Sequence, residues 1–121
     1  MLKGSSITTL DKWGRVRIPA KFKRIIEEEY GKDIFITSFD QKNILIYPLS
    51  EWENITVPIG EKAKENPTLR NFVIIINRLG MKTEMDKYGR ILIHELLRNR
   101  VNLKGEIVIE GKENHLVLKK T

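Results

Sequence analysis

Several features are missing from this 121-residue chain, and each absence excludes a class of chemistry. The chain contains no cysteine, so disulfide bonds, thiolate metal sites and cysteine nucleophiles are excluded together. It has two histidines, His94 and His115, and neither belongs to a set of residues with the spacing of metal ligands. We therefore expect no metal and no cofactor.

Long hydrophobic runs are also absent. The longest uninterrupted apolar run covers residues 72–76, far short of the roughly 20 residues that a membrane-spanning helix needs. Near the N-terminus, Lys3 is followed by small polar residues rather than by the apolar core of a signal peptide. The sequence therefore predicts a cytoplasmic protein that does not bind membranes.

Catalytic motifs are the third absence. The sequence contains no phosphate-binding loop, no dinucleotide-binding fingerprint and no nucleophile elbow. Ser5 and Ser6 precede Asp11, but these residues do not make a triad. We therefore expect no catalytic residues and no enzyme activity.

The most informative feature that is present is a repeat. Residues 11–15 read Asp-Lys-Trp-Gly-Arg and residues 86–90 read Asp-Lys-Tyr-Gly-Arg, an offset of 86 − 11 = 75 residues. Two copies are too few for a solenoid, which needs about three or more repeats to bury a core by stacking. The repeat therefore predicts one pseudo-twofold domain, with halves at about 1–48 and 79–121 and a helical connection over about 49–78.

Hydrophobic patterning extends the likeness between the halves. Each half is expected to contain a strand, a turn, a second strand, a helix and a β-hairpin. In the first half these elements are predicted at residues 7–10, 15–18, 19–30, 34–37 and 44–47. In the second half the strand after the motif, the helix and the hairpin are predicted at residues 90–93, 95–101, 107–109 and 116–118. The fold class is therefore α+β and mainly β.

The connection between the halves is predicted to hold two helices. Ser50 and Glu53 have the spacing of a capping box, which predicts a short helix that starts there. Pro58 and Gly60 predict an interruption, and Pro67 predicts the start of a second helix. That second helix is apolar on several sides, so it should be buried or meet another subunit. Trp52 is predicted to be a core or interface anchor.

The repeated motif itself predicts a tight turn that displays an arginine. Aspartate bonds its own backbone and glycine supplies a positive φ, so Asp11 and Gly14 suit such a turn. Alternation in the next strand places Arg15 and Arg17 on one face. An arginine placed in this way can bind guanine bidentately or grip a phosphate, but it can also pair with the turn aspartate as a local lock.

Positive charge is concentrated around the first copy. The formal net charge is +6 and the isoelectric point about 9.6, a balance that favours polyanionic partners. Residues 1–26 contain seven cations against the single acid Asp11: Lys3, Lys12, Arg15, Arg17, Lys21, Lys23 and Arg24. The second copy has Leu92 where the first has Arg17. We therefore expect Arg15 to matter more than Arg90.

Two further pairs occupy matching turn positions. Lys12 and Lys87 would be mobile phosphate contacts or solvated turn lysines. Trp13 and Tyr88 could stack on a sugar or base, but we expect them instead to cover the end of the barrel or a seam between subunits.

These residues resemble the MraZ family along nearly the entire chain. The first repeat is carried by Thr9-Leu10-Asp11-x-x-Gly14-Arg15-x-x-Ile18-Pro19-Ala20-Lys21-Phe22 and by Tyr47-Pro48-Leu49-x-Glu51-Trp52. The second repeat is carried by Asp86-Lys87-Tyr88-Gly89-Arg90-Ile91-Leu92-Ile93. His94 departs from the pattern, which usually has proline there.

The resemblance implies a tandem AbrB-like, swapped-hairpin barrel. It also implies a nucleoid-associated bacterial regulator that forms a homo-oligomeric ring and binds short direct repeats in double-stranded promoter DNA upstream of the division and cell-wall gene cluster. By position, together with the basic residues near the first copy, the expected DNA-binding residues are Lys3, Asp11, Lys12, Gly14, Arg15, Arg17, Asp86, Lys87, Gly89 and Arg90. The alternatives are an AbrB-like antitoxin or transition-state regulator, and an assembly protein that does not bind DNA.

Overall fold

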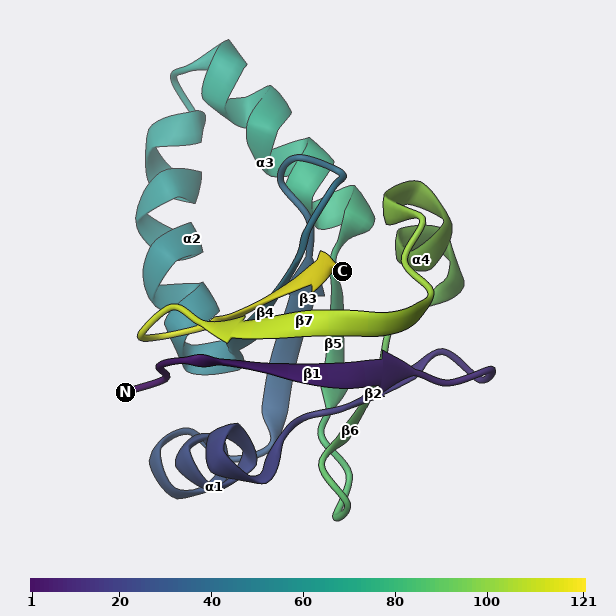
Figure 1. Ribbon diagram of the computed structural model, residues 1–121. Helices are drawn as coiled ribbons and strands as arrows, with labels where there is room; N and C mark the ends of the chain where they lie inside the picture. Colours follow the sequence, from purple (N-terminus) through teal and green to yellow (C-terminus); the bar gives the residue numbers. More distant parts are fainter.

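The computed structural model covers residues 1–121 and consists of eight strands and four helices (Figure 1). The first half contains β1 (Ser5–Leu10), β2 (Arg15–Arg17), α1 (Ala20–Glu29), β3 (Asp33–Thr37) and β4 (Ile44–Pro48). The connection contains α2 (Leu49–Ala63) and α3 (Pro67–Leu79). The second half contains β5 (Met81–Glu84), β6 (Arg90–Leu92), α4 (Glu95–Val101), β7 (Gly105–Gly111) and β8 (Leu116–Lys120). None of the helices combines the length and apolar character needed to traverse a bilayer.

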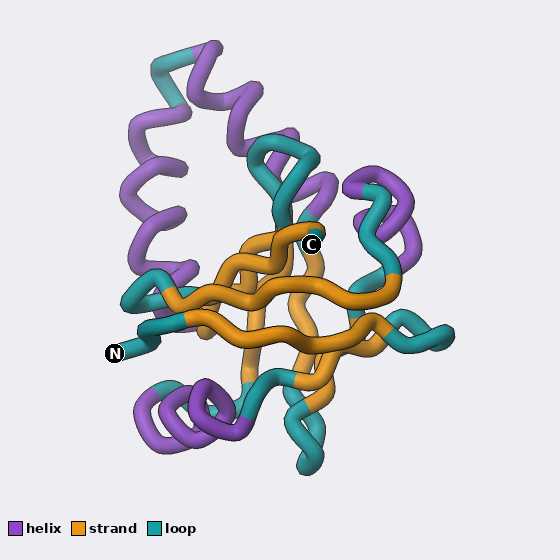
Figure 2. The backbone as a smooth tube through the Cα atoms, in the orientation of Figure 1, coloured by secondary structure: helices purple, strands orange, loops and turns teal.

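The strands form one antiparallel sheet that curls into a nearly closed barrel (Figure 2). The strand order is β5-β3-β4-β8-β7-β1-β2-β6. The halves exchange strands: β1 pairs with β7, β3 pairs with β5, and the two halves also meet through β2–β6 and β4–β8. Strands β1, β2, β3 and β4 correspond to β5, β6, β7 and β8 in the other half. When each strand is exchanged for its counterpart, the β1–β7 pair becomes the β5–β3 pair, and the β2–β6 and β4–β8 pairs are unchanged. The α+β, swapped-hairpin barrel is therefore confirmed, while the repeat boundaries at about 48 and 79 stay a prediction.

The alternating pattern of each strand fills the barrel interior. Val16 in β2 lies opposite Ile91 in β6, and both are fully buried, whereas Arg15 and Arg17 on either side of Val16 are exposed. The same alternation buries Ile107 and Ile109 in β7. Because strand residues face opposite sides in turn, burying the isoleucines and valines fixes the outward direction of the arginines.

Most predicted elements are confirmed with small shifts at their ends. The hairpins lie at β3–β4 and β7–β8, and the helices after the two motifs are α1 and α4. Helix α3 begins as predicted at Pro67, with the Asn66 side chain accepting a hydrogen bond from the backbone N–H of Leu69 at 3.1 Å. His94 takes the position before α4 that Pro19 takes before α1.

The prediction for residues 50–60 is wrong in two respects. The helix begins at Leu49, its cap position is Pro48, and no side chain caps it, so Ser50 and Glu53 do not form a capping box. The helix also continues through Pro58 to Ala63 instead of breaking there. Proline in a helix interior removes one backbone hydrogen bond. Packing of α2 against α3 and the sheet outweighs that local cost.

A second, smaller core explains this packing. Trp52 of α2 is buried, stacks on Phe35 of β3 at 4.4 Å between ring centroids, and lies 5.4 Å from the ring of Tyr47. Ile76 of α3 completes the cluster. The prediction that Trp52 is an anchor is therefore confirmed for the core.

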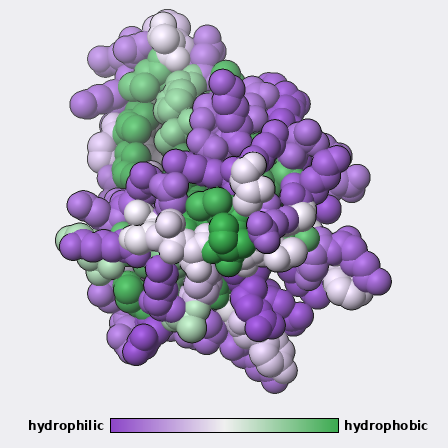
Figure 3. All heavy atoms as spheres, in the orientation of Figure 1, coloured by the Kyte–Doolittle hydropathy of each residue, from purple (hydrophilic) through white to green (hydrophobic).

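Helices α2 and α3 form a hairpin that packs on the barrel at its base and extends away from it at its tip (Figure 1). Its surface retains hydrophobic side chains that the chain itself does not cover: Val57, Phe72, Ile74 and Ile75. Figure 3 shows hydrophobic atoms gathered over these two helices. The expectation that α3 is buried is thus wrong for much of the helix. The alternative expectation, that α3 contacts another subunit, stays a prediction.

Candidate nucleic-acid interface

Turn 1, residues 11–14, is closed by the Asp11 carboxylate. Its Oδ1 accepts hydrogen bonds from the backbone N–H groups of Trp13 and Arg15, both at 2.9 Å. The backbone N–H of Gly14 donates to the Asp11 carbonyl at 3.1 Å, and Gly14 has a φ of 83°. Side chains other than glycine rarely adopt this left-handed conformation, so the motif needs glycine at this position.

Turn 2, residues 86–89, repeats this geometry. Oδ1 of Asp86 accepts from the N–H groups of Tyr88 at 2.9 Å and of Arg90 at 2.8 Å, and Gly89 has a φ of 79°. One contact has no counterpart in turn 1: Nε of Arg90 donates to Oδ2 of Asp86 at 2.8 Å.

These hydrogen bonds lower the pKa of both carboxyl groups. In turn 1, the Arg15 backbone N–H is the largest influence and holds the pKa of Asp11 below its usual value of 3.8. In turn 2, desolvation acts to raise the pKa of Asp86, but the hydrogen bonds from Arg90 and Tyr88 prevail and lower it. Both turns are therefore built around ionised aspartates at neutral pH.

The two turns are tied to each other across the β2–β6 pair. The backbone N–H of Ile93 donates to the carbonyl of Gly14 at 2.8 Å, and the N–H of Ile18 donates to the carbonyl of Gly89 at 2.7 Å. These bonds obey the 75-residue offset, since 93 − 18 and 89 − 14 both equal 75. Each turn is thus positioned by the strand end of the other half.

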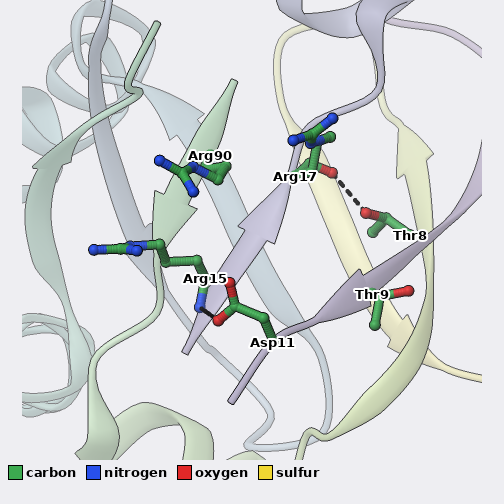
Figure 4. Close-up of a pocket in the computed structure, with 6 residues that line it drawn as sticks. All are labelled: Thr8, Thr9, Asp11, Arg15, Arg17 and Arg90. Atoms are coloured by element: carbon green, nitrogen blue, oxygen red, sulfur yellow. Dashed lines mark hydrogen bonds between the residues drawn. The ribbon is translucent and has the colours of Figure 1, made fainter. Parts of the chain in front are cut away.

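The strand pair brings three arginines together (Figure 4). Arg17 lies directly opposite Arg90 in the register, and Arg15 precedes Arg17 on the same face. With Asp11 and two threonines of β1, Thr8 and Thr9, they line an open hollow of about 350 Å³. Like charges placed opposite each other across strands repel, so this arrangement favours an anionic ligand that relieves the repulsion.

The arginines differ in how they are held. Arg90 is half-buried and paired with Asp86, whereas Arg15 is exposed and makes no salt bridge. In Figure 4 the Arg15 guanidinium extends away from Asp11, whose carboxylate holds only the Arg15 backbone. The interpretation of arginine as a local turn lock is therefore right for Arg90 and wrong for Arg15.

The turn lysines rest on the neighbouring aromatic rings. Nζ of Lys12 lies 4.6 Å from the ring centroid of Trp13, and Nζ of Lys87 lies 5.1 Å from that of Tyr88. Trp13 is 61% exposed and Tyr88 54%. Neither ring covers the end of the barrel, so that part of the expectation is wrong, and a place in a seam between subunits stays a prediction. Both rings are displayed at the turn tips.

Lys3 does not join this group. It precedes β1, whereas turn 1 follows β1, so the six-residue strand separates them by roughly 20 Å. Conversely, Thr8 and Thr9 line the hollow although neither is among the expected DNA-binding residues. Their place in the hollow follows from β1 lying beside β2, with the hydroxyl of Thr8 donating to the carbonyl of Arg17 at 2.6 Å.

The two histidines have structural contacts. Nε2 of His94 is 3.1 Å from the Leu79 carbonyl oxygen, and the His115 ring stacks on Tyr47 at 4.3 Å between ring centroids. Burial is the main cause that lowers the pKa of His115 below 6.5. His94 therefore ties the start of α4 to the end of α3, and His115 packs the β7–β8 turn against β4.

Exchanged strand pairing and two arginine-bearing glycine turns define a tandem swapped-hairpin barrel with a cationic face, as the resemblance implied. A family model described as "MraZ protein, putative antitoxin-like" matches residues 1–73. The chain is also similar to three proteins named Transcriptional regulator MraZ. The one from Acidobacterium capsulatum is 39% identical over 96% of this chain and 80% of the relative. The one from Koribacter versatilis is 36% identical over 98% and 82%, and the one from Neisseria meningitidis 33% identical over 98% and 79%.

The chain therefore belongs to the MraZ family. The relatives support a role in transcriptional regulation, and the family assignment places the chain among regulators rather than enzymes.

Proposed function

We propose that the chain is a sequence-specific regulator that binds short direct repeats in double-stranded DNA, upstream of the division and cell-wall gene cluster. The observation that carries the proposal is the cluster of Arg15, Arg17 and Arg90 on the β2–β6 pair. Arg15 in particular is exposed, follows a rigid turn and has no acidic partner. Such a side chain is free to bind a guanine edge or a phosphate. A cytoplasmic, nucleoid-associated location follows from this role.

Self-assembly into a ring is part of the proposal. One subunit offers a small cationic face, and a ring would present several such faces to spaced repeats, so modest affinities would multiply. The exposed hydrophobic side chains of the α2–α3 hairpin support a contact between copies of the chain. A light-scattering mass at micromolar concentration checks this step, and a monomeric mass contradicts it.

The central test is a gel-shift assay on the region upstream of the gene's own cluster. Arg15→Ala is expected to lose specific binding, because it removes the displayed guanidinium without touching the turn hydrogen bonds. Lys62→Ala is the control, because Lys62 is an exposed cation on α2, away from the hollow. Equal affinity of Arg15→Ala and the wild type would refute the proposal.

An AbrB-like antitoxin is the second candidate, favoured by the antitoxin-like description of the matching family model. Genomic context separates the two functions. A neighbouring toxin gene favours the antitoxin, and neighbouring methyltransferase and division genes favour the regulator. An assembly protein without DNA binding would instead leave Arg15→Ala without effect on any DNA.

A further inference from the structure

A second hollow, of about 520 Å³, lies beside turn 1. It is formed by turn 1, the exposed side of α4 and the loop that leads into β7. Lys12, Arg98 and Lys104 bring three positive charges to it, and Asp11 is its one acidic residue. Asp11 also lines the arginine hollow, so turn 1 is the wall between the two.

We propose that this second hollow is a phosphate site that grips one phosphodiester of the nucleic-acid backbone next to the segment bound by Arg15. This rests on the proposed function and names a contact that the repeated motif does not contain. Cations and side-chain amides are the usual donors to backbone phosphates, and Asn99 and Asn102 add two such amides to the three cations.

Arg98 is held in a way that suits this role. Its Nε donates to the Ile93 carbonyl at 2.8 Å, and its guanidinium lies against Gly14, where an added Cβ would be 2.8 Å from Cζ. The terminal nitrogens of Arg98 make no hydrogen bond. The guanidinium is thus fixed by one edge while the other edge stays available to an oxyanion.

The other two cations are unpaired by acids. Lys104 is exposed and takes part in no hydrogen bond or salt bridge, and Lys12 contacts only the ring of Trp13. The ionised Asp11 carboxylate opposes an anion, but its single negative charge is outnumbered by the three cations of the hollow. The net charge of the hollow therefore favours phosphate.

The equivalent position at turn 2 is neutralised. Lys23 lies against Gly89 as Arg98 lies against Gly14, and 98 − 23 equals the same offset of 75. However, Nζ of Lys23 is bound to Glu27 at 2.8 Å, and α1 continues with Glu28 and Glu29. None of the hollows in the structure is lined by Lys23. The phosphate site therefore belongs to turn 1 alone.

Salt-dependent fluorescence anisotropy tests the site. The affinity of wild type, Lys104→Gln and Lys62→Gln is measured between low and moderate salt on upstream repeat DNA and on a scrambled duplex. Lys104→Gln removes one cation from the hollow without breaking any contact, and Lys62→Gln makes the same charge change on α2. Weakening this one phosphate contact should reduce the slope of log affinity against log salt by up to about 0.9, equally on both duplexes.

The outcomes separate this site from the proposed function. A slope for Lys104→Gln equal to that of Lys62→Gln overturns the phosphate site, whatever Arg15→Ala does. Arg15→Ala is expected to lose its preference for repeat DNA, and Lys104→Gln is expected to keep it. If the wild type itself shows no preference for repeat DNA, the proposed function is overturned. The salt slopes on the scrambled duplex still decide the phosphate site in that case. Absence of wild-type binding to either duplex overturns both.

Discussion

Turn 1 and turn 2 have the same backbone and different side-chain environments. Each is closed by an aspartate that accepts two backbone hydrogen bonds, each needs a glycine at positive φ, and each is fixed by a hydrogen bond from the opposite half. Only in turn 2 does the aspartate also bind the arginine side chain. The difference shows that the motif encodes the turn geometry, while residues outside it decide whether the arginine is free.

The neighbours of each turn strengthen this contrast. Turn 1 adjoins Arg98 and Lys104 across the second hollow. Turn 2 adjoins the Lys23 amine that Glu27 holds, and the β2–β6 register places Arg17 opposite its Arg90, so the two turns share Arg17. Pseudo-symmetry therefore concerns the fold, and the positive charge is displayed mainly on one side.

The largest expected effect compares the two arginines directly. Arg15→Ala should weaken the contact of each subunit with upstream repeat DNA by about ten- to a hundredfold, because a bidentate contact contributes about 1–3 kcal/mol. Loss of the contact in several subunits of a ring should abolish specific binding. Arg90→Ala should weaken binding to the same DNA by about threefold, because the Arg90 guanidinium is already paired with Asp86 and has fewer free donors for a ligand. Anisotropy titrations with the same duplex give both values.

Equal losses for the two variants would end the claim that turn 1 dominates. The double variant Asp86→Asn with Arg15→Ala adds a sharper check, because it releases Arg90 from its carboxylate. Partial recovery of affinity relative to Arg15→Ala is expected if the Asp86 pairing is what limits turn 2.

The next effect concerns the turn glycines. Gly14→Ala should lower the free energy of unfolding by about 1–2 kcal/mol from its positive φ alone, and by more because the new Cβ lies 2.7 Å from Nε of Arg98. Gly89→Ala should cost less, since its closest neighbour is Cδ of the flexible Lys23 chain. Thermal unfolding of the variants measures both.

Gly31→Ala is the matched control for backbone strain. Gly31 has a φ of 90° and nothing within 4 Å of an added Cβ, so it reports the conformational cost without a clash. A Gly14→Ala variant as stable as Gly31→Ala would mean that Arg98 moves aside freely and does not fix the turn.

The smallest effect is a dependence on acid pH. Because the folded-state pKa values of Asp11 and Asp86 are lowered, their contribution to stability is fully present above the usual value of 3.8 and is lost as the pH falls through the lowered values. The melting temperature of the wild type should therefore fall more between about pH 5 and about pH 2 than that of Asp11→Asn with Asp86→Asn. Parallel curves would show that the carboxylate charges do not stabilise the turns.

Local sequence signals were sufficient where one residue type has a single physical reason to be there. Asp11 and Gly14 predict the turn, and the alternation around Val16 predicts the face of the sheet on which the arginines lie. Pro58 misled because its effect on α2 depends on a remote partner, the Trp52 stack, that only the tertiary structure supplies.

The site was predictable in its motif residues and not in its surroundings. Arg15, Arg17 and Arg90 come together through the β2–β6 register, which the repeat alone does not specify. No sequence pattern around Arg98 and Lys104 indicates that they belong to the site. They lie near turn 1 because the exchange of strands places the second half of the chain, with α4, beside the first. Lys3 was included for its charge and its place in the sequence, and β1 carries it to the opposite end.

The exchange of strands has a consequence for how the chain is made. Strand β1 pairs with β7, and the paired residues Ser5 and Glu110 are more than a hundred residues apart in the sequence. Strand β3 likewise pairs with β5 of the second half. Pairing between such distant segments loses the conformational entropy of a large loop before the stabilising contacts form, and this slows folding. The first half must therefore leave the ribosome with unpaired strand edges and an uncovered apolar face, and it reaches its native form only once the second half follows. Synthesis of β7, which follows the second motif, is thus the step that provides β1 with its partner.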